Sequence, residues 1–177
     1  DKSKFEVYAY SLSNIKDEYT VRVKKAVSVF REINNLSELS IVKLARDDKL
    51  DIAIDLNGYT KNNRISIFYY RVAPIQINYL GYTGSLGSNS FDYIIADKVL
   101  IPEENKKFYS EKILYLTNSS FPHDNTRELS VNKFTREELG LPSDAFVFTC
   151  FNSILKITRK EFNIWIRLLH KVEGSVL

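Results

Sequence analysis

The sequence has one cysteine, Cys150, and no methionine among its 177 residues. A single cysteine excludes intramolecular disulfides, and without a Cys-x-x-Cys pair or a cysteine and histidine cluster the chain lacks the ligands of a structural zinc site. Phe148 and Phe151 lie close to the thiol, so we expect Cys150 to be buried in a strand and not to be a nucleophile. Because methionine is missing even at position 1, and residues 175–177 look like the start of a strand, we expect a fragment of a longer protein.

Long apolar runs are also missing. No stretch approaches the roughly 18 consecutive apolar residues that a membrane-spanning helix needs, and residues 1–4 lack the apolar segment of a signal peptide. We therefore expect a cytoplasmic protein without membrane contacts. The 25 basic and 22 acidic side chains leave a net charge of +3, and the basic residues are scattered, which predicts no nucleic-acid partner. Apolar residues make up 44% of the chain, which is enough for a globular core.

Strand-like runs alternate with helical patterns, which is typical of βα units on a mostly parallel sheet and predicts an α/β fold. Strands are expected at residues 5–10, 51–56, 75–80, 91–96, 112–116 and 145–151. Apolar residues at helical spacing predict helices over residues 19–30 and 39–45. Another helix is expected to begin near Pro102, because proline and the two glutamates after it suit a first helical turn.

Residues 117–133 are polar, with few apolar side chains, and are expected to form an exposed connection that contains a domain boundary. Beyond it, Thr135–Glu138 and Thr158–Glu161 both have the sequence of a capping box, which opens a helix. Gly140 is expected to end the first helix. The second helix carries an apolar stripe that we expect to pack in the core, formed by Phe162, Trp165, Ile166 and Leu169.

Ligands bind to open parallel sheets where the strands end, so loops that directly follow strands are the candidates for a site. Leu80–Gly87 follows the strand expected at residues 75–80 and has three glycines, at 81, 84 and 87. Glycines let the backbone turn sharply and let a ligand approach its N–H groups. The spacing matches neither the dinucleotide fingerprint nor a Walker loop. On the residues alone, a ligand-binding loop and an ordinary turn both stay open.

The segment Asn152–Thr158 joins an expected strand to the second capping box. Lys156 lies two residues before the expected N-cap, where free N–H groups and the helix dipole already favour an anion, so it could add a positive charge beside a phosphate. Asn152 and Ser153 offer neutral donors and acceptors nearby. A solvated surface lysine is the alternative.

A third strand end, Asp55–Thr60, precedes Arg64 and Arg71, but its Asn-Gly pair favours an ordinary turn. His123 and His170 have no partner that the sequence identifies.

Five runs resemble, in order and spacing, the catalytic region of family 41 glycosyltransferases, the O-GlcNAc-transferase-like and SPINDLY-type enzymes. The runs are residues 51–60, 72–84, 91–97, 109–112 and 144–152. Bacterial members, which often carry tetratricopeptide repeats upstream, are the most similar. The resemblance implies a GT-B architecture, with two Rossmann-like domains facing each other across a cleft. Residues 1–123 would then be the back half of the first domain, and residues 124–177 the linker and the start of the second, UDP-sugar-binding domain.

The resemblance also assigns a donor site. The family loop that lies against the donor sugar corresponds to Leu80, Gly81, Tyr82, Thr83 and Gly84. The family lysine that contacts the UDP diphosphate corresponds to Lys156, in a segment that also contains Asn152, Ser153 and Thr158. Two positions differ from the family: Thr83 replaces a proline, which frees φ and adds a hydroxyl, and Ser153 is shorter than the usual amide.

The implied reaction is an inverting transfer of a sugar, GlcNAc above all, from a UDP-sugar to Ser or Thr hydroxyls of a protein or peptide. The alternatives are another UDP-sugar transferase, such as one that modifies asparagine, or a catalytically silent binding module. No Asp-x-Asp sequence occurs, so we expect neither a metal held by paired carboxylates nor another cofactor. The family's Asp-Phe-x-x-His segment would lie before Asp1 and the uridine-binding segments after Leu177, so the fragment alone is expected to be inactive.

Overall fold

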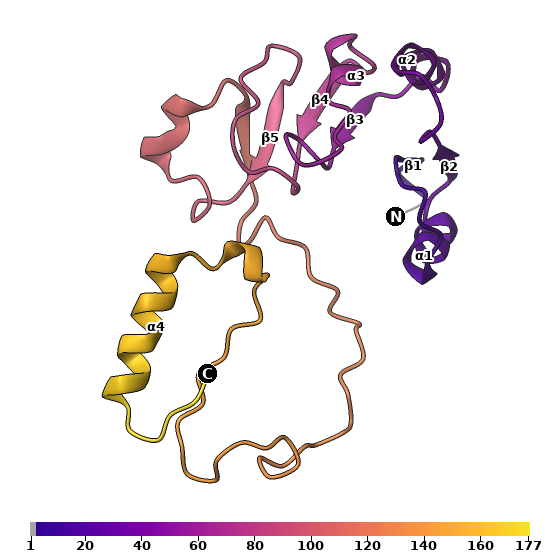
Figure 1. Ribbon diagram of the computed structural model, residues 1–177. Coiled ribbons are helices and arrows are strands. Elements are labelled where there is room, and N and C mark those ends of the chain that lie inside the picture. Colours follow the sequence, from indigo (N-terminus) through magenta and orange to yellow (C-terminus); the bar gives the residue numbers. More distant parts are fainter. Residues whose placement is uncertain (1–2) are drawn as a thin grey trace. The chain divides into compact units, whose positions relative to one another are not determined.

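The computed structural model describes residues 3–177 (Figure 1). The chain forms two compact units, Asp1–His123 and Asp124–Leu177, and each is described by itself. No helix among residues 3–177 is long and apolar enough to cross a membrane.

The first unit contains two parallel sheets. In the smaller one, β1 (Tyr8–Ser11) pairs with β2 (Val29–Glu32), and α1 (Glu18–Ala26) connects them. The larger sheet has the strand order β3-β4-β5-β6, with every pair parallel. Its strands are β3 (Ile52–Asp55), β4 (Ile75–Asn78), β5 (Tyr93–Ala96) and β6 (Lys112–Tyr115). Three helical segments belong to the same unit: α2 (Glu38–Asp47), α3 (Ser66–Tyr69) and the 3-10 helix η1 (Glu103–Phe108).

The expected helix over residues 19–30 is wrong at its end. α1 stops at Ala26, and the strand β2, which the helical spacing of apolar residues concealed, begins at Val29. The N–H groups of Ser28 and Val29 donate to the carbonyl of Val7, so pairing with the preceding strand replaces the next helical turn. A β-branched residue such as Val29 fits the pleated surface of a strand better than a helix.

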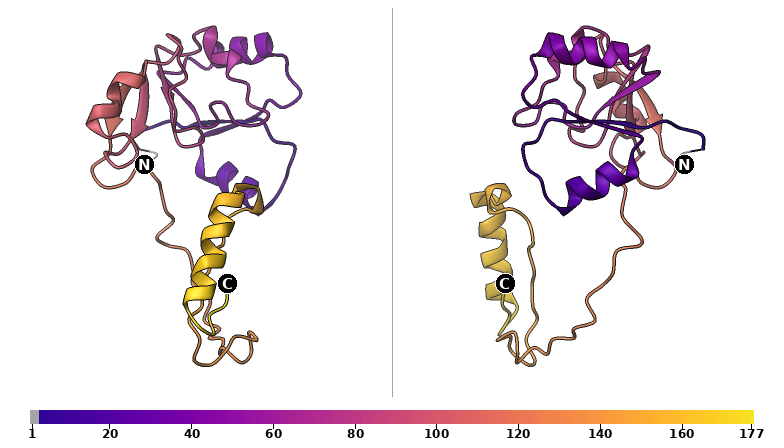
Figure 2. Two further views of the ribbon diagram at one scale, coloured as in Figure 1. Left: turned by 60° about the vertical axis from the view of Figure 1, so that its left-hand side comes forward. Right: turned by 90° about the vertical axis from the view of Figure 1, so that its right-hand side faces the viewer.

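One face of the larger sheet is covered by helices. Ala53 of β3 is buried in a cluster with Ile41 and Val42 of α2 and Ile67 of α3. Figures 1 and 2 show α2 and α3 beside each other over this end of the sheet. The packing of α2 and α3 against β3 therefore holds the end of that strand, and the loop that follows it, in place.

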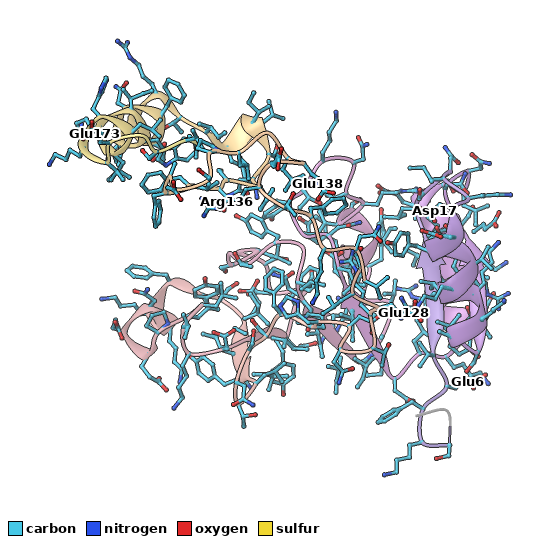
Figure 3. All side chains as sticks on the ribbon, turned by 90° about the horizontal axis from the view of Figure 1, so that it is seen from below. Glu6, Asp17, Glu128, Arg136, Glu138 and Glu173 are labelled. Carbon is cyan, nitrogen blue, oxygen red and sulfur yellow. The ribbon has the colours of Figure 1, made fainter. Side chains whose placement is uncertain are left out.

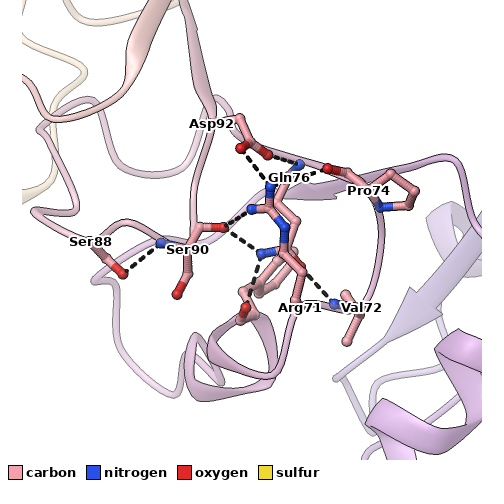
Figure 4. Close-up of polar contacts among 8 residues, drawn as sticks. Arg71, Val72, Pro74, Gln76, Ser88, Ser90 and Asp92 are labelled. Atoms are coloured by element: carbon pink, nitrogen blue, oxygen red, sulfur yellow. Dashed lines mark hydrogen bonds and ion pairs between the residues drawn. The ribbon is translucent and has the colours of Figure 1, made fainter.

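Gln76 is fully buried in the middle of this sheet and ties β4 to the segments before it and after it (Figure 4). Its side-chain oxygen accepts the N–H of Val72 at 2.9 Å, and its side-chain nitrogen donates to the carbonyls of Phe68 and Ser90. Its backbone N–H donates to Asp92 at 2.8 Å. One side chain thus joins four segments of the fold.

Arg71 belongs to the same hydrogen-bond network. Its backbone adopts the left-handed conformation, with a φ of +56°. Its guanidinium donates to the carboxylate of Asp92 at 2.6 Å and to the carbonyls of Ser90 and Pro74 at 2.9 and 3.1 Å. Burial acts to raise the pKa of Asp92, but the hydrogen bonds from Arg71 and from the Gln76 N–H outweigh it and lower that pKa.

The second unit has little regular structure: η2 (Ile154–Lys156), α4 (Arg159–Lys171) and one parallel bridge between Val147 and Val176. The strand expected at residues 145–151 is wrong, since only that bridge forms. A strand needs a ladder of partners, and residues 124–177 supply only the short segment around Val176.

Two burial predictions for this unit are also wrong. Cys150 is exposed, because it lines an unfilled hollow of about 190 Å³ between its own segment and Trp165, Leu168 and Leu169 of α4. None of the apolar stripe of α4 is buried, and Phe162 is 49% exposed.

The first capping box makes its hydrogen bonds without opening a helix. The N–H of Thr135 donates to Glu138 at 2.7 Å, and the N–H of Glu138 donates to the Thr135 hydroxyl at 3.2 Å. Arg136, labelled with Glu138 in Figure 3, donates to the carbonyls of Pro142, Ser143 and Ala145. These contacts close the segment into a turn, so the helix expected here is wrong.

Candidate functional site

The loop Leu80–Gly87 follows β4 and packs directly on the turn that follows β3. A Cβ atom on Gly81 would overlap with the carbonyl oxygen of Leu56, and a Cβ atom on Gly58 would overlap with the side chain of Tyr82. The two loops therefore interlock at positions where only glycine fits. Both lie at the carboxyl edge of parallel strands, which is where ligands bind to such sheets.

The turn after β3 is held by Asp55, which is buried at the end of that strand. Its carboxylate accepts the N–H groups of Asn57 and Gly58, both at 3.0 Å. Gly58 has a φ of +55°, which glycine adopts at little cost. This turn forms a firm support behind the loop Leu80–Gly87.

Replacing Gly81 by Ala is expected to push these two loops apart. We expect Gly81→Ala to destabilise the full-length protein by about 2 to 3 kcal/mol, because the Leu56 carbonyl is backbone and cannot turn aside. Gly87→Ala is the matched control: its Cβ would meet nothing within 4 Å, and only its φ of +61° opposes it, at a cost of about 1 kcal/mol. The measurement is the melting temperature, and an equal loss in both variants would contradict the interlocked arrangement.

The loop is also held from inside by side chains that donate to its carbonyl groups. Asn78, fully buried at the end of β4, donates its amide to the carbonyls of Tyr82 and Gly84 at 3.1 and 3.3 Å. Its side-chain oxygen has no hydrogen-bond partner among residues 3–177. The amide of Asn78 thereby turns two carbonyls of the loop toward the sheet.

Two tyrosines hold two further carbonyls of the loop. The hydroxyl of Tyr109 donates to the Thr83 carbonyl at 3.0 Å, and the hydroxyl of Tyr59 donates to the Leu86 carbonyl at 2.8 Å. The ring of Tyr59 also meets that of Tyr82 edge to face, with centroids 5.5 Å apart. Side chains from three separate parts of the chain thus fix one short loop.

Three N–H groups in the middle of the loop have no partner within residues 3–177, whereas those of Gly81, Leu86 and Gly87 are hydrogen-bonded. The three are the N–H groups of Tyr82, Thr83 and Gly84. Because the carbonyls of these residues are held by the protein, the loop offers backbone donors to an outside oxygen atom. Such an arrangement binds hydroxyl or anionic oxygens.

The segment that leaves β6 is fixed next to this loop. Asp97, just after β5, accepts the N–H and hydroxyl of Ser120, both at 2.7 Å, and the N–H groups of Val99 and Leu100. Led by the bond from the Ser120 N–H, these contacts lower the pKa of Asp97 to about 2. The hydroxyl of Tyr79 donates to the Ser120 carbonyl at 2.8 Å.

Leu80 and Thr83 line a small hollow in this region. Its other walls are Tyr79, Tyr82, Ile95, Leu100, Ser120 and Phe121, and its volume is about 10 Å³. That is room for roughly one water molecule. A sugar would therefore lie over the loop and not inside this hollow.

The other predicted site residues lie together in the second unit. Asn152, Ser153 and Lys156 are exposed around η2. Thr158 is the N-cap of α4, accepts the N–H of Lys160 at 3.2 Å and donates its hydroxyl to Glu161. Lys156 has no ion pair within residues 3–177, so its positive charge is open to a ligand beside the helix N-terminus.

The sequence did not single out Asn78, Asp97 or Tyr109, which shape the first loop. A usable signal exists for two of them, since Asn78 ends a strand and Asp97 directly follows one. Tyr109 begins the run 109–112 that resembles the family, but nothing in that run shows that its hydroxyl bonds to the loop. The two histidines, His123 and His170, are exposed and make no contact with a polar partner in the described residues. Among those residues, no group of three His, Cys, Asp or Glu side chains is placed to hold a metal ion.

The glycosyl transferase family 41 model matches residues 1–133. Over 183 residues the chain is 36% identical to the Arabidopsis thaliana protein named probable UDP-N-acetylglucosamine–peptide N-acetylglucosaminyltransferase SEC. Over 181 residues it is 30% identical to the Arabidopsis thaliana protein of the same enzyme name, SPINDLY. Both alignments cover 100% of this chain, but 19% of SEC and 20% of SPINDLY. The chain thus spans about a fifth of these relatives.

Among solved structures, a mutant of the Thermobaculum terrenum O-GlcNAc transferase matches with a TM-score of 0.83 and 24% sequence identity. The match covers 99% of this chain and 32% of that chain. It confirms the expected α/β, Rossmann-like fold of GT-B type. The assignment of residues 1–123 and 124–177 to the first and second GT-B domains stays a prediction.

Proposed function

Because the chain belongs to glycosyl transferase family 41, we propose that its full-length protein transfers N-acetylglucosamine from UDP-N-acetylglucosamine to Ser or Thr hydroxyls of a peptide. The printed names of SEC and SPINDLY state this donor and a peptide acceptor for those proteins. The observation that supports it most directly is the row of free N–H groups at Tyr82, Thr83 and Gly84, at the ligand-binding edge of the sheet.

The family resemblance assigns donor-binding roles to residues in each of the two units, and each set is considered by itself. In the loop Leu80–Gly84, the N–H groups of Tyr82, Thr83 and Gly84 donate to oxygens of the sugar. Lys156 and the N-terminus of α4, which begins after Thr158, bind the diphosphate. Asn152 and Ser153 provide neutral hydrogen-bonding groups next to Lys156.

The reaction is a single displacement with inversion. The acceptor hydroxyl oxygen attacks the anomeric carbon and loses its proton to a base, while the bond from that carbon to the diphosphate oxygen breaks. Negative charge grows on the departing UDP. The cationic Lys156 and the helix N-terminus stabilise that charge, which is the electrostatic contribution that dominates many enzymes.

No metal ion or other cofactor is part of this proposal, because a lysine and a helix N-terminus supply the positive charge. The expected tetratricopeptide repeats, bacterial origin and cytoplasmic location also stay predictions.

The test is donor screening with the full-length protein. UDP release is measured with UDP-N-acetylglucosamine, UDP-glucose and UDP-galactose, with and without a chelator, and the acceptor peptides are analysed by mass spectrometry. We expect release with UDP-N-acetylglucosamine, no effect of the chelator, and sugar on Ser or Thr. Sugar on asparagine would establish the N-glycosyltransferase alternative, and no turnover with any donor would establish a silent binding module.

A further inference from the structure

Glu111 is a buried carboxylate, 4% exposed, that lies just before β6 and has no part in the reaction above. It accepts the N–H of Leu86 at 2.6 Å, the hydroxyl of Ser85 at 2.7 Å and the hydroxyl of Ser110 at 3.1 Å. No lysine or arginine among residues 3–177 forms an ion pair with it. A buried anion is costly unless it is well hydrogen-bonded, so these three donors are what retains it.

Ser85 shows why a carboxylate is needed at this place. Its only hydroxyl hydrogen goes to Glu111, so its oxygen is free to accept the N–H groups of Gly87 and Ser110, at 3.1 and 3.2 Å. A glutamine at position 111 would present an amide N–H to Ser85 or to Leu86, both of which need an acceptor. The network closes only around a group that accepts at both oxygens.

The charge of Glu111 also reaches the two tyrosines that hold the loop carbonyls. Burial, followed by this charge, raises the pKa of Tyr109. The pKa of Tyr59 is raised first by a hydrogen bond to Tyr69 and by burial, and Glu111 adds to the rise. A tyrosine hydroxyl is already protonated at neutral pH, and the raised pKa extends its role as a donor to the loop to higher pH.

We propose that Glu111 is a positioning residue for the sugar-binding loop: it fixes residues 85–87, and thereby the free N–H groups of residues 82–84, in the orientation that binds the donor sugar. The inference rests on the proposed function, in which the diphosphate is bound by Lys156.

The test compares Glu111→Gln with the wild-type full-length protein in two measurements. We expect kcat/KM for UDP-N-acetylglucosamine to fall roughly 10- to 100-fold, since small displacements of a positioning loop have effects of this size, with most of the change in KM. The affinity for UDP, which has no sugar, is measured by calorimetry and is expected to be unchanged. Glu104→Gln is the control, since Glu104 is an exposed carboxylate of η1.

Ser85→Ala tests the same network if Glu111→Gln fails to fold. It keeps the bond from the Leu86 N–H to Glu111, so we expect a smaller rise in KM in the same direction. An unchanged KM in the folded variants, or an equal loss of affinity for UDP and for the UDP-sugar, would overturn the positioning role while leaving the proposed function intact. Wild-type protein without turnover would overturn both.

Discussion

Replacing Lys156 by alanine in the full-length protein is expected to remove about 2 to 4 kcal/mol of transition-state stabilisation, or roughly 30- to 1000-fold in kcat. The lysine is exposed, has no competing ion pair within residues 3–177, and lies two residues before the N-cap of α4. Its charge therefore adds to the helix dipole at the place where the leaving diphosphate becomes more negative. The measurement is steady-state UDP release at saturating donor.

Two further variants make this prediction specific. Lys171→Ala removes the same charge from the opposite end of α4 and is expected to leave kcat unchanged. Lys156→Arg keeps the charge with a different geometry and is expected to recover part of the activity. Near-normal turnover of Lys156→Ala would contradict the assigned role, and so would an equal loss of turnover in Lys171→Ala.

The sequence predicted the strands of the larger sheet well, because their apolar runs are bounded by clear turn residues. All four expected strands, at residues 51–56, 75–80, 91–96 and 112–116, form with ends that differ by at most two residues. Buried and more exposed positions alternate along β3 and β5, as expected of strands whose sheet is covered on one face. The strand β2 was missed because Tyr19, Val23, Ala26 and Phe30 also fit a helical period, and only pairing with β1 decides between the two.

The sequence predicted which loops form the candidate site, but it did not predict the side-chain contacts that hold the first loop in place. Glycine spacing at a strand end pointed to Leu80–Gly87, and the capping box pointed to Lys156. The contacts of Tyr109 and Glu111 with the loop depend on how the strand β6 is placed relative to β4, two positions away in the sheet. Both residues lie in the run 109–112 that resembles the family, but local sequence carries no information on such a placement, so their contacts with the loop could be found only in the folded chain.

The burial predictions for Cys150 and for the apolar stripe of α4 were wrong because they also depend on contacts with distant parts of the chain. The stripe on α4 and the segment around Cys150 have the composition of core elements, but burial requires partners. Residues 124–177 provide one bridge between Val147 and Val176 and a single long helix. A pattern in the sequence predicts which face would be buried, and not whether a neighbour is present to bury it.

Gln76→Leu is expected to destabilise the full-length protein by about 2 to 4 kcal/mol, without any change in the donor site itself. Leucine fills much of the same space, but the buried N–H of Val72 loses its acceptor. The carbonyls of Phe68 and Ser90 lose one donor each and keep another from Arg71, so the N–H of Val72 dominates the cost. Burial of the apolar leucine side chain offsets part of the cost of leaving the Val72 N–H unpaired.

The measurement is the free energy of unfolding by denaturant, or the melting temperature where unfolding is irreversible. Asn89→Leu is the matched control, because Asn89 is an exposed amide in the connection between β4 and β5 and its loss should be nearly neutral. A Gln76→Leu variant as stable as Asn89→Leu would show that the network in Figure 4 does not hold the sheet together. Gln76→Leu leaves the ion pair between Arg71 and Asp92 in place. A large decrease in the free energy of unfolding would therefore show that the buried amide of Gln76, and not this ion pair, provides the stabilisation.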